Sequence, residues 1–352
     1  MKRTLALVGV LSALACASGG GARLTPIAAL AAPAELAEPA ARLLLIGDAG
    51  DAAGREHLLR VAAWVDAHAA PTTVVFLGDN FYPRSRGKGG KGIAPIFGPQ
   101  LEVGRAAADV FFVPGNHDWH DSGIGRPHPA RIESLAAHVG AQHWKPAPGA
   151  FGPHELAFPH RLFRVIALDS EQWLMARYAC ADATDAACKP AKVTTAEQEL
   201  EALLACADCP PAVVVAHHPL RSTGEHGGCE LSFLRRSVKP SQDLAATEYR
   251  RYVASLSSVL EKRRPLLFAA GHDHSLQVAL DSRFGAHVVS GAGAHSTAVC
   301  GAASENWSRN GFMALDFVSG AAPLLRVFAH DAATCGASEF CEVLREPLAL
   351  AR

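Results

Sequence analysis

The sequence has almost no excess charge of either sign. Its 352 residues have a formal net charge of -1, so we expect no long-range attraction to nucleic acid or to anionic membranes. The chain has no internal repeats, and its N-terminal apolar run, Thr4–Ala15, is too short to span a bilayer as a stable anchor. With 49% hydrophobic residues the chain can nevertheless bury a substantial core.

Paired CxxC motifs are also absent. The sequence has one such motif, Cys206–Cys209, and this favours a structural disulfide over a zinc site or a redox site. Setting Cys16 aside, eight cysteines remain from nine, an even number typical of disulfides in an oxidising compartment. The sequence does not determine their connectivity. The local pairs that it favours are Cys180 with Cys188 and Cys335 with Cys341.

The N-terminus has the pattern of an export signal. Met1–Arg3 is basic, Thr4–Ala15 is apolar, and Ala13–Cys16 resembles a bacterial lipobox, in which the cysteine is lipidated. The alternative is cleavage near Ala15 or Ala17 and release of a soluble protein. In both cases we expect an exported protein, in the periplasm or at the outer membrane or cell surface.

The rest of the chain divides into a tether and one domain. Residues 16–40 are rich in Ala, Gly and Pro and are expected to be a flexible tether, and residues 41–346 are expected to form a single domain. Helical spacing predicts helices over residues 55–68, from Thr195 to Ala205 after a capping box, and along Tyr249–Leu260. The predicted strands are Leu43–Ile46, Val74–Leu77, Val110–Val113, Leu162–Leu168, Ala212–Ala216, Leu266–Ala270, His287–Ser290, Phe312–Phe317 and Leu324–Ala329. This order indicates an α/β sandwich with a more antiparallel second half.

Residues that bind metals follow five of the apolar runs. The segments are Asp48–Gly50, Gly78–Tyr82, Gly115–Asp118, Val214–His217 and Gly271–His274. They supply two carboxylates, one phenolate, one amide oxygen and three imidazoles, with one histidine left over, and this inventory suits two adjacent metal ions. Oxygen and nitrogen donors without thiolate favour iron, manganese or zinc, and a pair of such ions promotes in-line displacement at phosphorus. Each segment follows a predicted strand, where the loops of an α/β sheet converge.

These segments resemble the calcineurin-like metallophosphoesterase superfamily. More narrowly, they resemble the purple acid phosphatases, especially the small, tartrate-resistant mammalian type. Gly50 stands where most of the superfamily carries a metal-binding histidine, and Tyr82 follows Asp79 by three residues. Glu225–Gly227 follows His217–Pro219 at the distance that this family shows. The resemblance implies a metallophosphoesterase sandwich of two mixed β-sheets flanked by helices.

The resemblance also implies a role for each metal-binding residue. The first metal, expected to be Fe(III), would be held by Asp48, Tyr82 and His274. The second, a divalent iron, zinc or manganese ion, would be held by Asn116, His217 and His272. Asp79 would bridge the two ions.

Three further residues are implied to be catalytic. His117 is expected to be the general acid or a phosphate-binding residue, and Asp118 is expected to orient it. His226 matches a second histidine on the substrate side. His120 and His218 are interpreted as neighbours of the site that do not bind metal.

The implied activity is that of an exported acid phosphatase. It would hydrolyse phosphomonoesters by attack of a metal-bound hydroxide on phosphorus. Its partner would be a small phosphorylated substrate, with no nucleic acid and with membrane contact only through a lipid anchor. The alternatives are a phosphodiesterase or nucleotide hydrolase, and a surface-anchored binding protein with a vestigial metal site. The pairing of Tyr82 with iron also permits a redox role.

Three stretches depart from the family pattern. Residues 84–91 carry four positive charges among glycines, which would attract acidic substrates or simply form a solvated loop. Residues 171–193 occupy the position of a regulatory loop and contain two cysteines, so a disulfide-stapled lid is a hypothesis for them. Residues 228–264 form a longer segment than the family has and are expected to contribute to the pocket wall.

Overall fold

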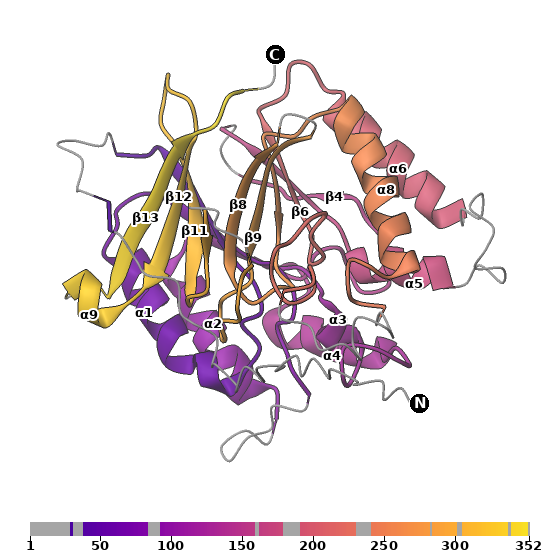
Figure 1. The fold of residues 1–352 in the computed structure, drawn as a ribbon, viewed down its shortest axis with the longest axis horizontal. Helices are drawn as coiled ribbons and strands as arrows, with labels where there is room; N and C mark the ends of the chain where they lie inside the picture. Colours follow the sequence, from indigo (N-terminus) through magenta and orange to yellow (C-terminus); the bar gives the residue numbers. More distant parts are fainter. Residues whose placement is uncertain are drawn as a thin grey trace, which may run out of the picture.

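Two β-sheets pack against each other, and helices cover their outer faces (Figure 1). The structure is a computed structural model that describes residues 29–30, 38–83, 92–158, 162–178, 191–229, 241–281, 284–300, 305–336 and 339–350. Both sheets mix parallel and antiparallel strands. The predicted sandwich of two mixed sheets flanked by helices is therefore confirmed.

The first sheet has six strands in the order β13-β12-β11-β1-β2-β3. Its parallel strands are β1 (Ala41–Ile46), β2 (Thr72–Phe76) and β3 (Asp109–Phe112). Its antiparallel strands are β11 (Gly311–Phe317), β12 (Leu324–His330) and β13 (Phe340–Pro347). The C-terminal part of the chain thus completes the sheet that the N-terminal part begins.

The second sheet has seven strands in the order β10-β8-β9-β7-β6-β5-β4. Its parallel core is β5 (Arg164–Ala167), β6 (Ala212–Val215), β7 (Leu267–Ala270) and β9 (Gly285–Ser290). The antiparallel strands are β4 (His154–Glu155), β8 (Leu276–Asp281) and β10 (Asn306–Trp307).

The helices form two outer layers. The first sheet is covered by α1 (Arg55–Asp66), α2 (Ala94–Ala106) and α4 (Pro129–Val139). The second is covered by α5 (Ser170–Tyr178), α6 (Ala191–Leu204) and α8 (Thr247–Lys262). The remaining short helices are η1 (Ala52–Gly54), α3 (Asn116–Trp119) and α9 (Ala332–Cys335).

The apolar runs are continuous because the central strands are buried on both faces. In β1, Leu43 and Leu45 point into the core between the sheets, whereas Leu44 and Ile46 point toward the helices of the first layer. All four leucine and isoleucine side chains have no exposed surface. This double burial is typical of parallel strands covered on both sides. It explains why the strands can be recognised in the sequence as continuous apolar runs.

The nine predicted strands are all present, with ends that differ by one or a few residues. The predicted start of the helix at Thr195 is wrong, because α6 begins at Ala191. The Thr195 hydroxyl donates a hydrogen bond to the Ala191 carbonyl (3.0 Å), a bond from within a helix and not from a cap. Val193, which is fully buried, packs the first turn of α6 into the core.

Three disulfides join described residues. Cys206–Cys209 and Cys335–Cys341 confirm two pairs that the sequence favours, and Cys229–Cys300 links segments 71 residues apart. Cys180 and Cys188 lie outside the described residues, as do the export signal, Cys16 and the basic stretch 84–91. The Cys229–Cys300 disulfide joins the segment before α8 to the loop after β9.

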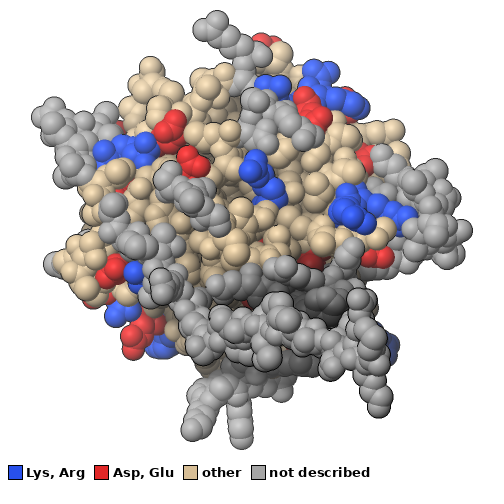
Figure 2. Space-filling model, viewed as in Figure 1, with Lys and Arg blue, Asp and Glu red and all other residues tan. Residues whose placement is uncertain are grey.

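No helix among the described residues has the length and apolar character to cross a membrane. Figure 2 shows Lys and Arg side chains interspersed with Asp and Glu on the face in view. This mixture agrees with the near-zero net charge of the chain.

We expect acid to destabilise the fold through His57 on α1. Burial, and next the nearby His330, lower the pKa of His57 to about 3, so it stays neutral in the folded protein. Below its ordinary pKa of 6.5 the unfolded chain takes up a proton that the folded chain does not, so this contribution to stability falls from pH 6.5 toward pH 3. Between pH 6.5 and pH 3, the melting temperature of His57→Leu should fall less steeply with decreasing pH than that of the wild type. The exposed His138→Leu on α4 is the control, and an unchanged slope in His57→Leu would contradict the assignment.

Candidate metal centre

The metal-binding segments meet at one edge of the two sheets. Asp48 follows β1, Asp79 follows β2, and Asn116 begins α3 directly after β3. His217 follows β6 and His272 follows β7 in the second sheet. Because the carboxyl ends of these parallel strands lie at the same edge, side chains far apart in sequence become neighbours.

The first cluster of donors contains Tyr82, Asp48 and His274. The Tyr82 hydroxyl lies 3.0 Å from Asp48 Oδ1 and 3.1 Å from His274 Nε2. Asp48 Oδ1 and His274 Nε2 are themselves 3.5 Å apart. These are the three residues assigned to the first metal.

The second cluster contains His217, Asn116 and His272. His217 Nε2 lies 2.8 Å from Asn116 Oδ1, 3.3 Å from His272 Nδ1 and 3.5 Å from Asp79 Oδ2. Asp79 lies between the clusters, since Asp48, Asp79 and His217 each offer a ligand atom within 4.8 Å of the others. All seven predicted ligands are thus brought together, with Asp79 in the position of a bridge.

The second cluster is suited to a cation because its acceptor atoms face one another. His217 Nδ1 lies 2.9 Å from the Leu77 carbonyl and His272 Nε2 lies 2.9 Å from the Gln242 carbonyl, so each of these nitrogens must donate. In the neutral rings, the other nitrogens then point their lone pairs into the cluster. Asn116 is held likewise, because its Nδ2 donates to the Gly123 carbonyl (3.0 Å) and leaves Oδ1 free to accept. A metal ion would satisfy all of these lone pairs at once.

The electrostatics of the cluster also favour a bound cation. Burial alone would lower the pKa of His217, but the carboxylate of Asp79 outweighs it and raises that pKa to about 10. Burial, and then Asp48, hold the pKa of Tyr82 well above its ordinary value. Without a metal the protein would therefore hold a proton between His217 and Asp79, and ionisation of Tyr82 needs a nearby cation.

The backbone around the site is strained. Asp48, Asp79 and His272 have positive φ angles of 58°, 51° and 74°, a region that residues with a side chain seldom occupy. Asp48 Oδ2 accepts a hydrogen bond from the His272 backbone N–H (2.7 Å), and Asp79 Oδ1 accepts one from the His117 backbone N–H (2.8 Å). These bonds hold the strained residues in place and tie the loops of the two sheets together.

Glycines allow these loops to approach so closely. A Cβ at Gly115 would lie 2.2 Å from the Asp79 nitrogen, and one at Gly78 would lie 2.5 Å from His217 Nδ1. A Cβ at Gly50 would lie 2.3 Å from the backbone of the Asn80–Phe81 peptide. A histidine could therefore not replace Gly50 without moving the loop that carries Asp79 and Tyr82.

His117 and His226 lie beside the clusters. The ring of His117 packs against Tyr82 with ring centroids 4.5 Å apart. The ring of His226 stacks on His272 at 4.0 Å, and its Nδ1 lies 2.9 Å from Asp243 Oδ1. Both histidines thus pack directly against residues of the two clusters.

Asp118 makes different contacts from those expected. Its Oδ2 accepts hydrogen bonds from the Gly115 backbone N–H (2.8 Å) and the Asn80 side-chain amide (3.0 Å). Its Oδ1 has no hydrogen-bond partner among the described residues. A hydrogen bond to the His117 ring is therefore not found, and Asp118 instead fixes the loops that carry Asn116 and Asp79.

His218 lies close enough to His217 and His272 to form a third group of candidate ligands. Its two nitrogens, however, lie 2.8 Å from Ser170 Oγ and 2.7 Å from Gln242 Oε1. This agrees with its interpretation as a neighbour of the site. Gln242 is the contact that sequence reasoning missed, since it carries no motif and reaches His272 through its backbone carbonyl.

Comparison with known proteins agrees with this geometry. The fold and the paired clusters define a metallophosphoesterase. A model of the calcineurin-like phosphoesterase family matches residues 41–276, more than half of the chain, and the chain belongs to this family. No curated protein sequence matches the chain.

Three solved structures share the fold at low identity. GAP50, the anchor in the inner membrane complex of Plasmodium, has a TM-score of 0.56 at 16% identity and covers 89% of each chain. A dimetal phosphatase from Danio rerio has a TM-score of 0.52 at 17% identity, over 88% of this chain and 100% of that one. The purple acid phosphatase PPD1 from yellow lupin seeds has a TM-score of 0.52 at 16% identity, over 84% of this chain and 52% of that one.

We expect Gly115→Ala to weaken metal binding. The added Cβ would collide with the Asp79 backbone and with its Oδ1, at 2.3 Å, and would displace the bridging carboxylate. Zinc affinity measured by calorimetry should fall by about tenfold or more. Gly98→Ala is the matched control, because a Cβ there meets nothing within 4 Å and removes a glycine from helix α2. Equal zinc affinity in Gly115→Ala and the wild type would show that the contact between residue 115 and Asp79 tolerates a side chain.

Proposed function

We propose that the protein is an acid phosphatase that hydrolyses phosphomonoesters at a two-metal centre. The observation that carries this proposal is the convergence of seven oxygen and nitrogen donors into two clusters that share Asp79. Two bound metal ions would activate water and neutralise the charge on phosphate oxygens. A pair of adjacent ions can stabilise both the attacking and the leaving oxygen of an in-line displacement at phosphorus.

The histidines supply the substrate side of the proposed site. His117 is tied to the bridging carboxylate through its backbone N–H, so its ring is held in a fixed position above Tyr82. We propose that His117 gives a proton to the leaving oxygen or binds a phosphate oxygen. His226, held by Asp243 and stacked on His272, would contact the same phosphate from the other cluster.

Tyr82 supports the narrower assignment to the purple acid phosphatase type. Its hydroxyl belongs to the first cluster, and Gly50 allows the loop that carries Tyr82 to approach the loop after β1. A phenolate is a hard anionic donor, so we propose Fe(III) at this position and a divalent iron, zinc or manganese ion at the other. A trivalent ion lowers the pKa of bound water further than a divalent one, which favours activity in acid.

We also propose that the protein is exported and tethered through Cys16. The three disulfides among the described residues fit an oxidising compartment. The N-terminal sequence supplies the signal and the lipobox-like Ala13–Cys16. A lipid on Cys16 would hold the phosphatase at a membrane surface.

A second candidate is a binding protein that has the same fold but does not hydrolyse a substrate. It is favoured by the similarity to GAP50, which is described as an anchor. Against it stands the complete donor set, because a site freed from catalysis has no need to keep three strained residues. A phosphodiesterase or nucleotide hydrolase would use the same centre and differ only in its substrate.

We expect the mature protein, supplied with iron and zinc, to hydrolyse an aryl phosphate monoester between about pH 4 and pH 8 with an optimum on the acid side. Turnover of the monoester should exceed that of the matched aryl phosphodiester. Preference for the diester would favour the phosphodiesterase. No turnover of either ester, with two metals shown to be bound, would favour the binding protein.

His117→Ala should keep both metals and lose activity by about 100-fold or more, because a general acid contributes that much to a phosphoryl transfer. Metal content and rate are to be measured on the same sample. The control is His295→Ala, which removes an exposed histidine whose ring centroid lies 6.1 Å from that of His274. If His117→Ala loses less than tenfold in activity, His117 is not the general acid of the proposed mechanism.

Tyr82→Phe should remove the visible colour of the iron-loaded protein more completely than it removes hydrolysis. The colour arises from charge transfer between phenolate and Fe(III), which phenylalanine does not support. Tyr252→Phe is the control, since that buried hydroxyl donates to the His218 carbonyl (2.8 Å) and lies outside both clusters. Colour retained in Tyr82→Phe would refute the assignment of Tyr82 as a ligand.

A further inference from the structure

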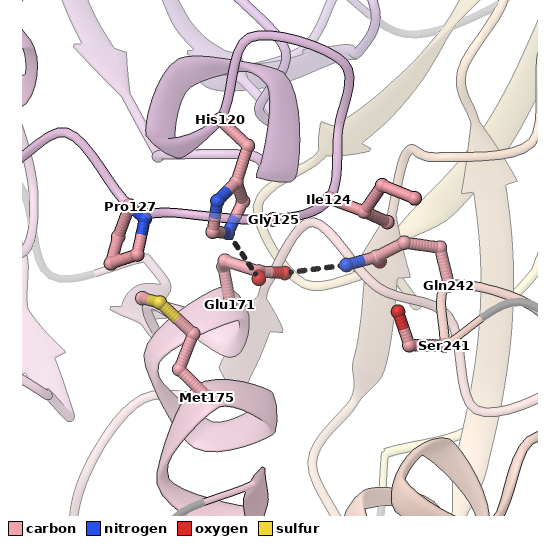
Figure 3. A pocket seen from close by; sticks show the side chains of 8 residues that line it. All are labelled: His120, Ile124, Gly125, Pro127, Glu171, Met175, Ser241 and Gln242. Carbon is pink, nitrogen blue, oxygen red and sulfur yellow. Dashed lines mark hydrogen bonds and ion pairs between the residues drawn. The ribbon is translucent and has the colours of Figure 1, made fainter.

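A pocket with a volume of about 400 Å³ lies beside the metal centre, because one of its lining residues, Gln242, contacts His272. Figure 3 shows the side chains that line it. Its walls come from three places: the loop after α3, the first turns of α5, and residues 241–242, which precede α8. The family motifs include none of these residues. Pockets of this volume are large enough to bind small organic molecules.

The pocket and the metal centre share their walls. Gln242 lines the pocket, and its backbone carbonyl accepts a hydrogen bond from His272 Nε2 (2.9 Å). On the opposite wall, Ile124 lines the pocket, and the carbonyl of its neighbour Gly123 accepts a hydrogen bond from Asn116 (3.0 Å). Two ligands of the second metal site are therefore in direct contact with the backbone that forms the pocket.

One part of the pocket surface is apolar. It is formed by Ile124, Pro127 and Met175, and Figure 3 shows Ile124 and Met175 projecting from separate segments around it. Ile124 is 47% exposed, so a large apolar side chain is left in contact with solvent at this point. Burying such a side chain against an apolar ligand is favourable, and the flexible Met175 side chain can adapt to different shapes.

The other part is a fixed polar chain. His120 Nε2 lies 2.9 Å from Glu171 Oε1, and the Gln242 side-chain amide donates to Glu171 Oε2 (3.1 Å). All three side chains are buried, and the dashed lines in Figure 3 trace these bonds between segments. Glu171 is therefore paired on both carboxylate oxygens, and the polar groups left to a ligand are the Ser241 hydroxyl and His120 Nδ1. This combination suits a mostly apolar ring system better than a sugar or a second phosphate.

We propose that this pocket binds the leaving group of the substrate and that the substrate is a phosphate ester of an aromatic alcohol with one or two rings. The assignment rests on the proposed phosphatase function, because it takes the phosphate to lie at the metal centre between His117 and His226. The ester substituent then enters the adjoining apolar volume. The pocket, and not the shared metal site, sets the substrate class.

The test compares two esters whose leaving groups have similar acidity but differ by one ring, phenyl phosphate and 4-phenylphenyl phosphate. The wild type should show a kcat/KM about tenfold higher for the larger ester, because the second ring is buried in the pocket. In Ile124→Ser this ratio should fall to about one. Leu59→Ser, which removes a similarly exposed apolar side chain from α1, is the control and should keep the wild-type ratio. An unchanged ratio in Ile124→Ser would overturn the proposal.

A binding measurement separates this proposal from the proposed function. The fluorescence of 4-phenylphenol, the alcohol released from the larger ester, reports its binding without any turnover. Ile124→Ser should bind it at least about fivefold more weakly than the wild type and the Leu59→Ser control. If neither ester is hydrolysed but this difference is found, the phosphatase function fails and the pocket assignment stands. If the wild type does not bind 4-phenylphenol, or if Ile124→Ser binds it equally well, the pocket assignment is wrong.

Discussion

The site depends on one constraint: buried carboxylate, imidazole and amide groups converge at one edge of the two sheets and need a proton or a metal ion between them. Asp48 and Asp79 are almost fully buried, and lone pairs of His217, His272 and Asn116 converge beside them. Such an arrangement is costly unless a cation neutralises it. The strained backbone of Asp48, Asp79 and His272 adds to this cost. The packing of the two sheets must therefore hold these residues together, and a bound metal ion would take the place of the proton between His217 and Asp79.

Burial of apolar side chains in the surrounding sandwich offsets that cost. Strands buried on both faces supply three contiguous apolar cores, one between the sheets and one under each layer of helices. The buried pair of Arg42 and Asp316 joins neighbouring strands β1 and β11 through two hydrogen bonds of 2.6 Å and 3.0 Å. Because each cluster contains residues from loops of both sheets, the packing of the sheets determines the distances within each cluster. Rigidity of the core is thus a condition for the geometry of the site.

Segments outside the metal-binding motifs also pack against this centre. The loop after α3, helix α5 and residues 241–242 lie outside the metal-binding motifs and form a pocket against ligands of the second cluster. Residues 171–178, which the sequence places in a loop, are helical, and Glu171 is buried between His120 and Gln242. The two cysteines of the hypothesised lid, Cys180 and Cys188, lie outside the described residues.

The sequence by itself determined the strands and the sandwich, and it singled out the seven residues that the structure brings into two clusters. It could do so because double burial makes a strand a continuous apolar run, and because each ligand directly follows such a run. Only the tertiary structure decided how Asp118 is used, since its partners Gly115 and Asn80 belong to two different loops. The same holds for the Cys229–Cys300 pair and for the contact of Gln242 with His272. These contacts join residues distant in sequence through backbone atoms or side chains without a motif, and only the packing of the two sheets brings them together.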